Sequence, residues 1–314
     1  MKHTKDTKLF LHVLRALRGK SFSREFTTVI TVKNLTYTYP RATEETLHGL
    51  TFTIAEGEIF GFLGPSGAGK STTQNILIGL LKTYGGEVQV MNREISAWGQ
   101  DYYEHIGVSF ELPNHYLKLS ALENLNHFRS LYSGDTHDPL EVLSWVGLQD
   151  DAHKKVEAFS KGMKIRLNVA RSIVHKPKVL FLDEPTTGLD PVNARNVKDL
   201  VLELRRQGTT VFVTTHDMMV ADELCDRVAF ITAGNISLID APKALKKHYG
   251  RRVIDVEYIN GASEIQHQEF PLDGLGDNQD FIALLKAAGR LETVHTQETT
   301  LEKIFIGVTG QELT

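Results

Sequence analysis

The sequence predicts an α/β fold built on a mostly parallel β-sheet that is covered on both faces. Three short runs of mainly apolar residues occur at 59–63, 178–182 and 210–215. A helical pattern occupies 192–207 between the second and third runs, and Gly208 ends it. Apolar runs of strand length that alternate with helices are typical of strands buried inside a parallel sheet.

The composition indicates a globular protein whose overall charge gives no sign of nucleic-acid binding. The 314 residues are 41% hydrophobic and 24% charged, with a net charge of -4. Cys225 is the single cysteine, so no intrachain disulfide forms and a reducing compartment is favoured. It falls in an ordinary helical pattern, which favours packing over a nucleophilic role. No apolar run reaches the roughly 18 residues of a membrane span, so action at a membrane requires a partner.

Changes in character divide the chain into three parts. Residues 1–28 carry seven Lys and Arg against two acids; they are either a basic amphipathic segment for lipid or a partner, or a disordered tail, which we favour. A core domain is expected at 29–245, with a helical insertion at about 100–170. Residues 250–314 are expected to form a small α+β domain. Its predicted strands and helices are 253–258, 281–288, 291–295 and 301–306.

Two further strands and a turn are predicted inside the core domain. The first strand begins near Ile30 and ends before Pro40, and the second covers 51–54. The sequence Ala-Gly-Asn at 233–235 predicts a hairpin turn.

A glycine-rich loop that follows the first buried run carries the strongest chemical signal. It fits the pattern G-x-x-x-x-G-K-[ST] and reads Gly64-Pro65-Ser66-Gly67-Ala68-Gly69-Lys70-Ser71. The glycines let backbone N–H groups curl around a phosphate, and Lys70 adds a cation for the β- and γ-phosphates. Ser71 supplies an oxygen ligand for Mg²⁺. We therefore expect ATP to bind from Gly64 to Thr72, with Mg²⁺ as its cofactor.

Polar residues end two of the buried runs. Asp183 and Glu184 follow the run at 178–182, and His216 follows the run at 210–215. The carboxyl ends of parallel strands meet at one edge of the sheet, where ligands bind. We expect Asp183 to hold Mg²⁺ and Glu184 to polarise the attacking water. His216 alone is more often structural, but its place at this edge favours a functional role.

A third segment makes the family recognisable. It lies just before the strand with the two acids and reads Phe159-Ser160-Lys161-Gly162-Met163-Lys164-Ile165-Arg166. Together with Gly-Leu-Asp-Pro at 188–191 and Thr-His-Asp at 215–217, it resembles the nucleotide-binding subunit of ABC transporters over about residues 30–240. The resemblance implies a P-loop ATPase core with an antiparallel β subdomain and a helical insertion.

The resemblance also implies roles for individual residues. Tyr39 stacks on adenine, and residues 64–72 form the Walker A loop. Asp183 is the Walker B acid, Glu184 the catalytic carboxylate, and His216 the switch histidine at the γ-phosphate. The signature residues contact ATP held by an opposite subunit, and Asp190 communicates across the dimer. The signature residues are Ser160, Lys161, Gly162 and Met163.

Two positions depart from the family pattern. Lys161 and Met163 replace the usual residues of L-S-G-G-Q, although Ser160 and Gly162 remain. Glu111 stands where the family has the glutamine of the Q-loop. A carboxylate there still binds Mg²⁺ but adds charge near the γ-phosphate. Either hydrolysis slows or its Mg²⁺ dependence tightens, or Glu111 is merely tolerated.

The resemblance implies the ATP-hydrolysing subunit of an ABC transporter, and the tail at 299–310 resembles exporter ATPases. We expect a peripheral protein on the cytoplasmic face of the cell membrane, paired with a second copy or a related subunit. A separate membrane permease would dock near 111–119, and no nucleic acid is expected. One alternative is a soluble ABC protein acting on DNA or ribosomes, but the long coiled coil or second cassette of such proteins is missing. The other is a low-turnover regulatory module, which Glu184 and His216 oppose and Glu111 keeps open.

Overall fold

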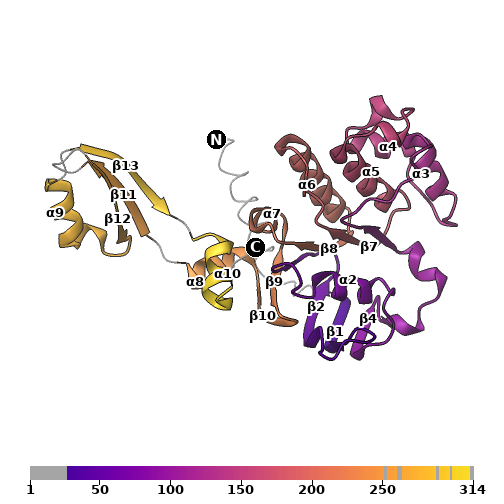
Figure 1. Cartoon of the computed structure of the whole chain (residues 1–314), viewed down its shortest axis with the longest axis horizontal. Coiled ribbons are helices and arrows are strands. Elements are labelled where there is room, and N and C mark those ends of the chain that lie inside the picture. Colours follow the sequence, from indigo (N-terminus) through magenta and orange to yellow (C-terminus); the bar gives the residue numbers. More distant parts are fainter. Residues whose placement is uncertain (1–26, 251–252, 260–263, 288–289, 298, 312–314) are drawn as a thin grey trace, which may run out of the picture.

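A computed structural model describes residues 27–250, 253–259, 264–287, 290–297 and 299–311 (Figure 1). The predictions for the basic N-terminal segment lie outside the described residues, apart from its last two positions. Two sheets and most of the helices form the body of the molecule. A third, smaller sheet, formed by β11, β12 and β13, lies apart from that body at the left of the view (Figure 1).

The central sheet has the strand order β10-β9-β3-β8-β7-β6. Its strands are β3 (Ile59–Leu63), β6 (Ile106–Ser109), β7 (Val179–Asp183), β8 (Thr210–Thr215), β9 (Arg227–Thr232) and β10 (Asn235–Asp240). All neighbours are parallel except β9 and β10, which form the hairpin expected at 233–235. The mostly parallel sheet is therefore confirmed. The predicted start of the helical insertion, at about residue 100, was wrong, because β6 follows it and pairs with β7 in the central sheet.

A second, antiparallel sheet covers one face of the central sheet. Its order is β2-β1-β4-β5, with β1 (Thr28–Tyr37), β2 (Leu47–Ala55), β4 (Gly85–Val90) and β5 (Arg93–Glu94). Aromatic rings fill the space between the two sheets: Phe52 of β2 stacks on Phe60 of β3 at 5.5 Å, and Phe62 lies 5.5 Å from Phe212 of β8. Alternate residues of the buried strands enter this core, as the strand period of two requires.

Helix α2 (Lys70–Leu77) joins this core, and the remaining helices of the body cover the opposite face. These are α3 (Ala121–Arg129), α4 (Pro139–Trp145), α5 (Lys161–Ile173), α6 (Pro191–Arg206), α7 (Met218–Leu224) and α8 (Pro242–Tyr249). Short 3₁₀ turns lie at η1 (Ile95–Ala97), η2 (Gln100–Glu104), η3 (Gln149–Asp151) and η4 (Val156–Ala158). Helices α3, α4 and α5 contact one another and form the helical subdomain. Among the described helices, none is long and apolar enough to cross a bilayer.

The C-terminal sheet has the order β12-β11-β13, with one helix against it. Its elements are β11 (Val253–Ile259), β12 (Ile265–Pro271), η5 (Leu275–Asp277), α9 (Gln279–Ala287) and β13 (Arg290–Gln297). Strand β12 was not predicted from the sequence. Phe270 is its one buried residue, so the strand has no alternation of apolar and polar residues. Val256, Phe270 and Leu284 form a small core that is separate from those of the body.

The last helix, α10 (Leu301–Thr309), packs differently from the expectation that placed it in the C-terminal α+β domain. It contacts α7, α8 and β10 of the body (Figure 1). The ring of Phe305 meets Phe230 of β9 edge to face at 5.2 Å. The helical pattern at 301–306 predicted a buried face, but it held no information about which surface would cover that face.

Candidate nucleotide-binding site

The phosphate-loop pattern joins β3 to α2, as the sequence predicted. Gly69 precedes the helix with a φ of 107°, and a Cβ there would lie 2.7 Å from Leu47, so only glycine fits without strain. The Lys70 ammonium donates hydrogen bonds to the carbonyls of Gly64 (2.6 Å) and Pro65 (3.0 Å). The lysine therefore spans its own loop, beside the helix N-terminus that favours phosphate.

Lys70 lies within the electric field of three carboxylates. Burial lowers the pKa of its ammonium, while the charges of Glu184, Asp183 and Glu111 act in the opposite direction. The structure thus brings together four predicted site residues from three separate segments. A triphosphate bound on the loop would be repelled by these three carboxylates. Lys70 alone cannot balance so much negative charge, so a second cation is needed at the site.

Asp183 ends β7 beside Thr214 of β8, whose hydroxyl donates a hydrogen bond to its carboxylate. Burial is the main cause that raises the pKa of Asp183, and the charges of Glu111 and Glu184 add to it. The Thr214 hydrogen bond and Lys70 oppose the rise. A divalent cation bound beside Asp183 would stabilise its charged form and so lower this raised pKa.

Glu184 is buried and held by several hydrogen bonds. It is 8% exposed and has a φ of 48°, a left-handed conformation that costs energy in a residue other than glycine. Its carboxylate accepts hydrogen bonds from the Thr187 hydroxyl (3.1 Å), the Thr215 hydroxyl (3.0 Å) and the His216 backbone N–H (2.9 Å). The neighbouring structure therefore fixes the direction of the carboxylate, which is what a base that orients water requires.

His216 completes this arrangement from the end of β8. Its Nδ1 lies 2.6 Å from Glu184 Oε1, and the side chain is 56% exposed. The described residues offer no hydrogen-bond partner to Nε2, which leaves that nitrogen available to a ligand. The contact between Glu184 and His216 was not predicted as a pair, although both were expected at the same sheet edge.

Tyr39 lies two residues beyond β1, next to the phosphate-binding segment. Its hydroxyl is 3.0 Å from the hydroxyl of Thr72 in the first turn of α2, and its ring meets Tyr37 edge to face at 4.9 Å. The ring is 40% exposed. It can therefore present an aromatic surface beside the loop.

Glu111 follows β6 in an exposed segment that is tied to the signature helix. Asn168 of α5 donates a hydrogen bond to the Phe110 carbonyl (2.7 Å) and another to the Ser109 hydroxyl (3.0 Å). These hydrogen bonds therefore couple any movement of this segment to α5. Sequence reasoning missed Asn168, because a polar residue in a helical pattern gives no sign of its partner.

The signature residues begin α5 on the other side of this link. Ser160 caps the helix, accepting a hydrogen bond from the Met163 N–H (3.2 Å). Gly162 faces Leu189, with 3.4 Å from an added Cβ to its side chain, and Asp190 caps α6. Within the described part of the chain, no hydrogen bond or ion pair joins these residues to the phosphate loop. The structure therefore gathers the loop, Glu111, the two acids and His216, and it leaves Ser160 and Lys161 of the signature exposed, without a hydrogen bond or ion pair to the described loop residues.

Ser71 and Asp183 offer the hydroxyl and carboxylate oxygens that suit Mg²⁺. The described residues contain no preformed group of three or more His, Cys, Asp or Glu side chains that could hold a metal. Such a site fits a cation that arrives with phosphate oxygens, since Mg²⁺ is usually held by one or two carboxylates plus substrate.

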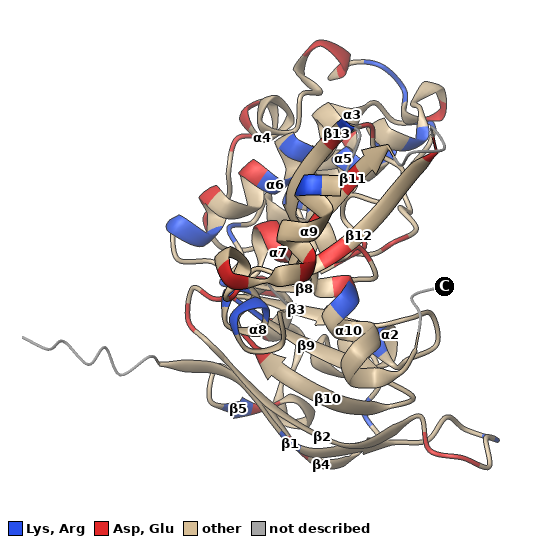
Figure 2. Ribbon diagram, turned by 90° about the vertical axis from the view of Figure 1, so that its left-hand side faces the viewer, with Lys and Arg blue, Asp and Glu red and all other residues tan. Residues whose placement is uncertain are grey.

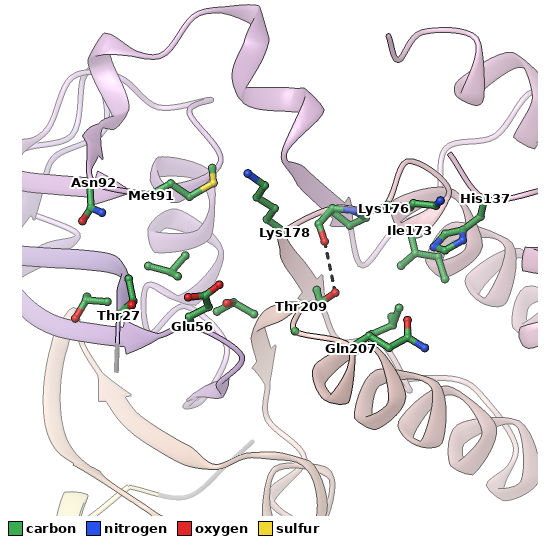
Figure 3. A pocket seen from close by; sticks show the side chains of 16 residues that line it. Thr27, Glu56, Met91, Asn92, His137, Ile173, Lys176, Lys178, Gln207 and Thr209 are labelled. Atoms are coloured by element: carbon green, nitrogen blue, oxygen red, sulfur yellow. Dashed lines mark hydrogen bonds between the residues drawn. The ribbon is translucent and has the colours of Figure 1, made fainter. Parts of the chain in front are cut away.

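A separate pocket lies at the amino ends of β7 and β8 (Figure 3). It has a volume of about 520 Å³ and is lined by residues that include Glu56, His137, Lys176 and Lys178. None of the predicted site residues lines it. The candidate site at the carboxyl ends of the same strands is therefore distinct from this pocket.

Fold and site together define an ATP-binding cassette, and comparisons with known proteins agree. The family described as ABC transporter matches residues 47–187, and the fluoroquinolone efflux ABC transporter C-terminal domain matches 252–298. The chain is 52% identical over 297 residues to a fluoroquinolones export ATP-binding protein of Mycobacterium tuberculosis (strain H37Rv), covering 95% of this chain and 98% of the relative. The chain belongs to the ATP-binding subunits of ABC transporters.

Two further comparisons support this assignment. A Nod factor export ATP-binding protein I of Rhizobium sp. (strain N33) is 36% identical, over 85% of this chain and 93% of its own. The dimeric post-hydrolysis structure of an ATP-binding cassette bound to ADP and Pi has a TM-score of 0.62 and 30% identity, covering 68% and 98%. The predicted family, fold class and transport-coupled ATPase function are confirmed. The soluble and regulatory alternatives are not favoured.

Proposed function

We propose that this chain binds ATP at the phosphate loop, hydrolyses it with Glu184, and thereby drives an exporter through a separate membrane permease. The observation that carries the proposal is the network at Glu184, whose carboxylate is oriented by four hydrogen bonds next to Asp183 and Lys70. Groups placed before the reaction in this way need little reorganisation during it. The similarity of this chain to export ATP-binding proteins supports the proposed role in export.

In this proposal each residue has a defined task. Lys70 and the loop amides hold the phosphates, Tyr39 holds the base, and Glu184 accepts a proton from the attacking water. His216 contacts the γ-phosphate through Nε2, the nitrogen that does not face Glu184. Mg²⁺, when bound, neutralises phosphate charge. Its ligands from this chain would be Ser71, Asp183 and Glu111.

A second subunit completes the site. Ser160, Lys161, Gly162 and Met163 are proposed to contact the ATP of a partner cassette, with Asp190 at the dimer contact. The proposal is supported by the exposed position of Ser160 at the N-terminus of α5, where a helix end favours phosphate. It is also supported by the dimeric form of the related cassette structure.

We place the permease contact at residues 111–119, beside a cleft between the core and the helical subdomain. Tyr103, Phe110 and Tyr116 line this cleft and are 38%, 38% and 51% exposed. Leu112 is 80% exposed and Leu117 is 49% exposed. Apolar and aromatic side chains gathered in this way are typical of a protein interface, and they would hold the chain on the cytoplasmic face of the membrane.

Co-purification tests this contact. Leu112→Asp should remove the permease from the chain isolated with its membranes, while ATP binding stays unchanged. Leu140→Asp is the matched control, since Leu140 is 47% exposed but lies on α4. Retention of the permease by Leu112→Asp would show that the contact lies elsewhere.

The exported substrate is proposed to be a fluoroquinolone or a similar drug. Support comes from the 52% identical relative and from the matched C-terminal domain at 252–298. Loss of the chain should increase the sensitivity of its cell to fluoroquinolones, and restoring the gene should reverse this. Equal sensitivity with and without the chain would contradict this substrate but not the ATPase function.

The domain boundaries are proposed as a core of about 29–245 and a C-terminal part from 250. Figure 2 views the molecule from the side of the C-terminal sheet, which overlies α7 in that direction. Within the C-terminal part, β11, β12 and β13 form the sheet and α10 contributes to the core of the body.

A further inference from the structure

The end of the chain returns to the ATPase body after forming a separate sheet. The chain leaves the body at the end of α8, forms β11 to β13, and comes back as α10 (Figure 1). Helix α10 contacts both α8 and α7. The C-terminal sheet is therefore attached to the body at both of its ends.

Helix α10 is part of the main hydrophobic core. Leu301, Ile304 and Phe305 are 1%, 3% and 0% exposed. Their spacing places them on one face of the helix. They belong to the same cluster as Met218, Ala221 and Leu224 of α7.

Helix α7 begins directly after His216. Asp217 caps it by accepting hydrogen bonds from the N–H groups of Met219 (2.9 Å) and Val220 (3.1 Å). The N–H of Asp217 donates to the Thr215 hydroxyl (3.0 Å), which also donates to Glu184. His216 thus lies between the end of β8 and the first turn of α7, so its direction depends on where α7 is held.

Helix α7 also packs against α6, and Lys198 of α6 forms an ion pair with Glu223 of α7. Lys246 of α8 is 2.5 Å from Asp222 of α7, in a partly exposed ion pair. Such a pair contributes little by itself. The buried face of α10 adds an apolar contact to α7 from outside the central sheet, and Phe305 fixes α10 itself against Phe230 of β9.

We propose that α10 is a positioning element of the ATPase site, in which Phe305 sets the place of α7 and, through it, the direction of His216. The proposal rests on the proposed roles of Glu184 and His216. Because the phosphate loop leads into α2, whose buried residues belong to the other core of the body, α10 should change turnover far more than nucleotide binding.

The test compares two phenylalanines that are similarly buried and make similar ring contacts, but lie in different cores. Phe305 meets Phe230 edge to face at 5.2 Å, and Phe270 in the C-terminal sheet meets Phe281 edge to face at 5.3 Å. Both are buried, at 0% and 3% exposure. We would prepare full-length Phe305→Ala and Phe270→Ala, and measure kcat, KM, the Kd of a fluorescent ATP analogue and thermal unfolding.

Phe305→Ala should lower kcat roughly tenfold or more, because small misplacements of a reacting group are costly. Its KM and Kd should stay within about twofold, whereas Phe270→Ala should keep the wild-type kcat. If Phe305→Ala does not fold, Phe305→Leu should show the same split between kcat and Kd with a smaller loss.

Three results would overturn the proposal. These are an unchanged kcat in a folded Phe305 variant, a loss of ATP-binding capacity in proportion to kcat, and an equal loss in Phe270→Ala. The proposed function is tested separately by Glu184→Gln. If Glu184→Gln keeps turnover, the proposed function is wrong. If Glu184→Gln loses turnover but the Phe305 variants behave like wild type, the proposed function stands and α10 only stabilises the fold.

Discussion

Replacing Glu111 with glutamine removes one negative charge from the site and leaves the shape of the side chain nearly unchanged. The charge of Glu111 helps to raise the pKa of Asp183 and opposes the lowering of the pKa of Lys70 by burial. Without it, Asp183 should hold its proton less strongly. Since a carboxylate must be ionised to bind Mg²⁺, the acidic limb of the ATPase profile should move to lower pH.

The size of this effect follows from the exposure of Glu111. The side chain is exposed, so solvent and salt screen its charge. Interactions between exposed charges contribute about 1 kcal/mol or less, and about 1.4 kcal/mol corresponds to one pKa unit. We therefore expect a modest move of the acidic limb to lower pH and a gain in turnover of roughly two- to fivefold at low Mg²⁺.

The assay is an ATPase titration against pH and Mg²⁺ for wild type and Glu111→Gln. Glu141→Gln is the control, because Glu141 is exposed on α4 and away from the site. Identical curves for wild type and Glu111→Gln would show that this charge has no effect on the metal. A loss of turnover that excess Mg²⁺ restores would contradict the prediction, because it would show that the metal needs the charge of Glu111 and that a neutral amide oxygen cannot replace it.

Three further predictions concern binding, assembly and stability. Lys70→Ala should weaken the binding of a fluorescent ATP analogue by at least tenfold, and an unchanged affinity would exclude the loop as the site. In the Glu184→Gln background, ATP should produce a dimer by light scattering and an added Ser160→Arg should prevent it; a dimer that persists would contradict the signature contact. Burial lowers the pKa values of His115 and His175 to about 4, so each stabilises the fold fully above an ordinary pKa of 6.5 and loses its contribution as the pH falls toward 4. Urea unfolding should show a loss of about 2–3 kcal/mol for each histidine between pH 6.5 and 4.5, and His175→Gln should make that pH dependence shallower.

The elements with continuous burial were predictable from the sequence. Strands β3 and β8 are buried at every position, and β7 at every position before its final aspartate, so their apolar runs marked them clearly. Strand β6 has only four residues and one neighbour, so its pattern was too short to identify. Strand β12 lies at a sheet edge with mostly exposed polar residues, and no pattern of hydrophobicity could reveal it.

The candidate site was predictable as a set of residues but not as a geometry. The phosphate-loop spacing and the acids at the end of a buried strand identified Lys70 and Asp183. The contact of His216 Nδ1 with Glu184 depends on the pairing of β7 with β8, which the sequence does not state. The place of α10 likewise depends on tertiary packing, since an amphipathic pattern predicts burial without naming the partner surface.

The most direct test of the account is single-turnover hydrolysis by Glu184→Gln in the presence of Mg²⁺. The substitution removes the base but keeps a side chain of the same size, whose single oxygen can still accept from His216, while its NH2 group faces the hydroxyls of Thr187 and Thr215, which can turn to accept. ATP binding should therefore remain within a few-fold of wild type, while hydrolysis falls by about 10²-fold or more, as expected when a general base is lost. Hydrolysis at the wild-type rate, with ATP bound on the loop, would show that Glu184 does not act on water and would contradict the proposed mechanism.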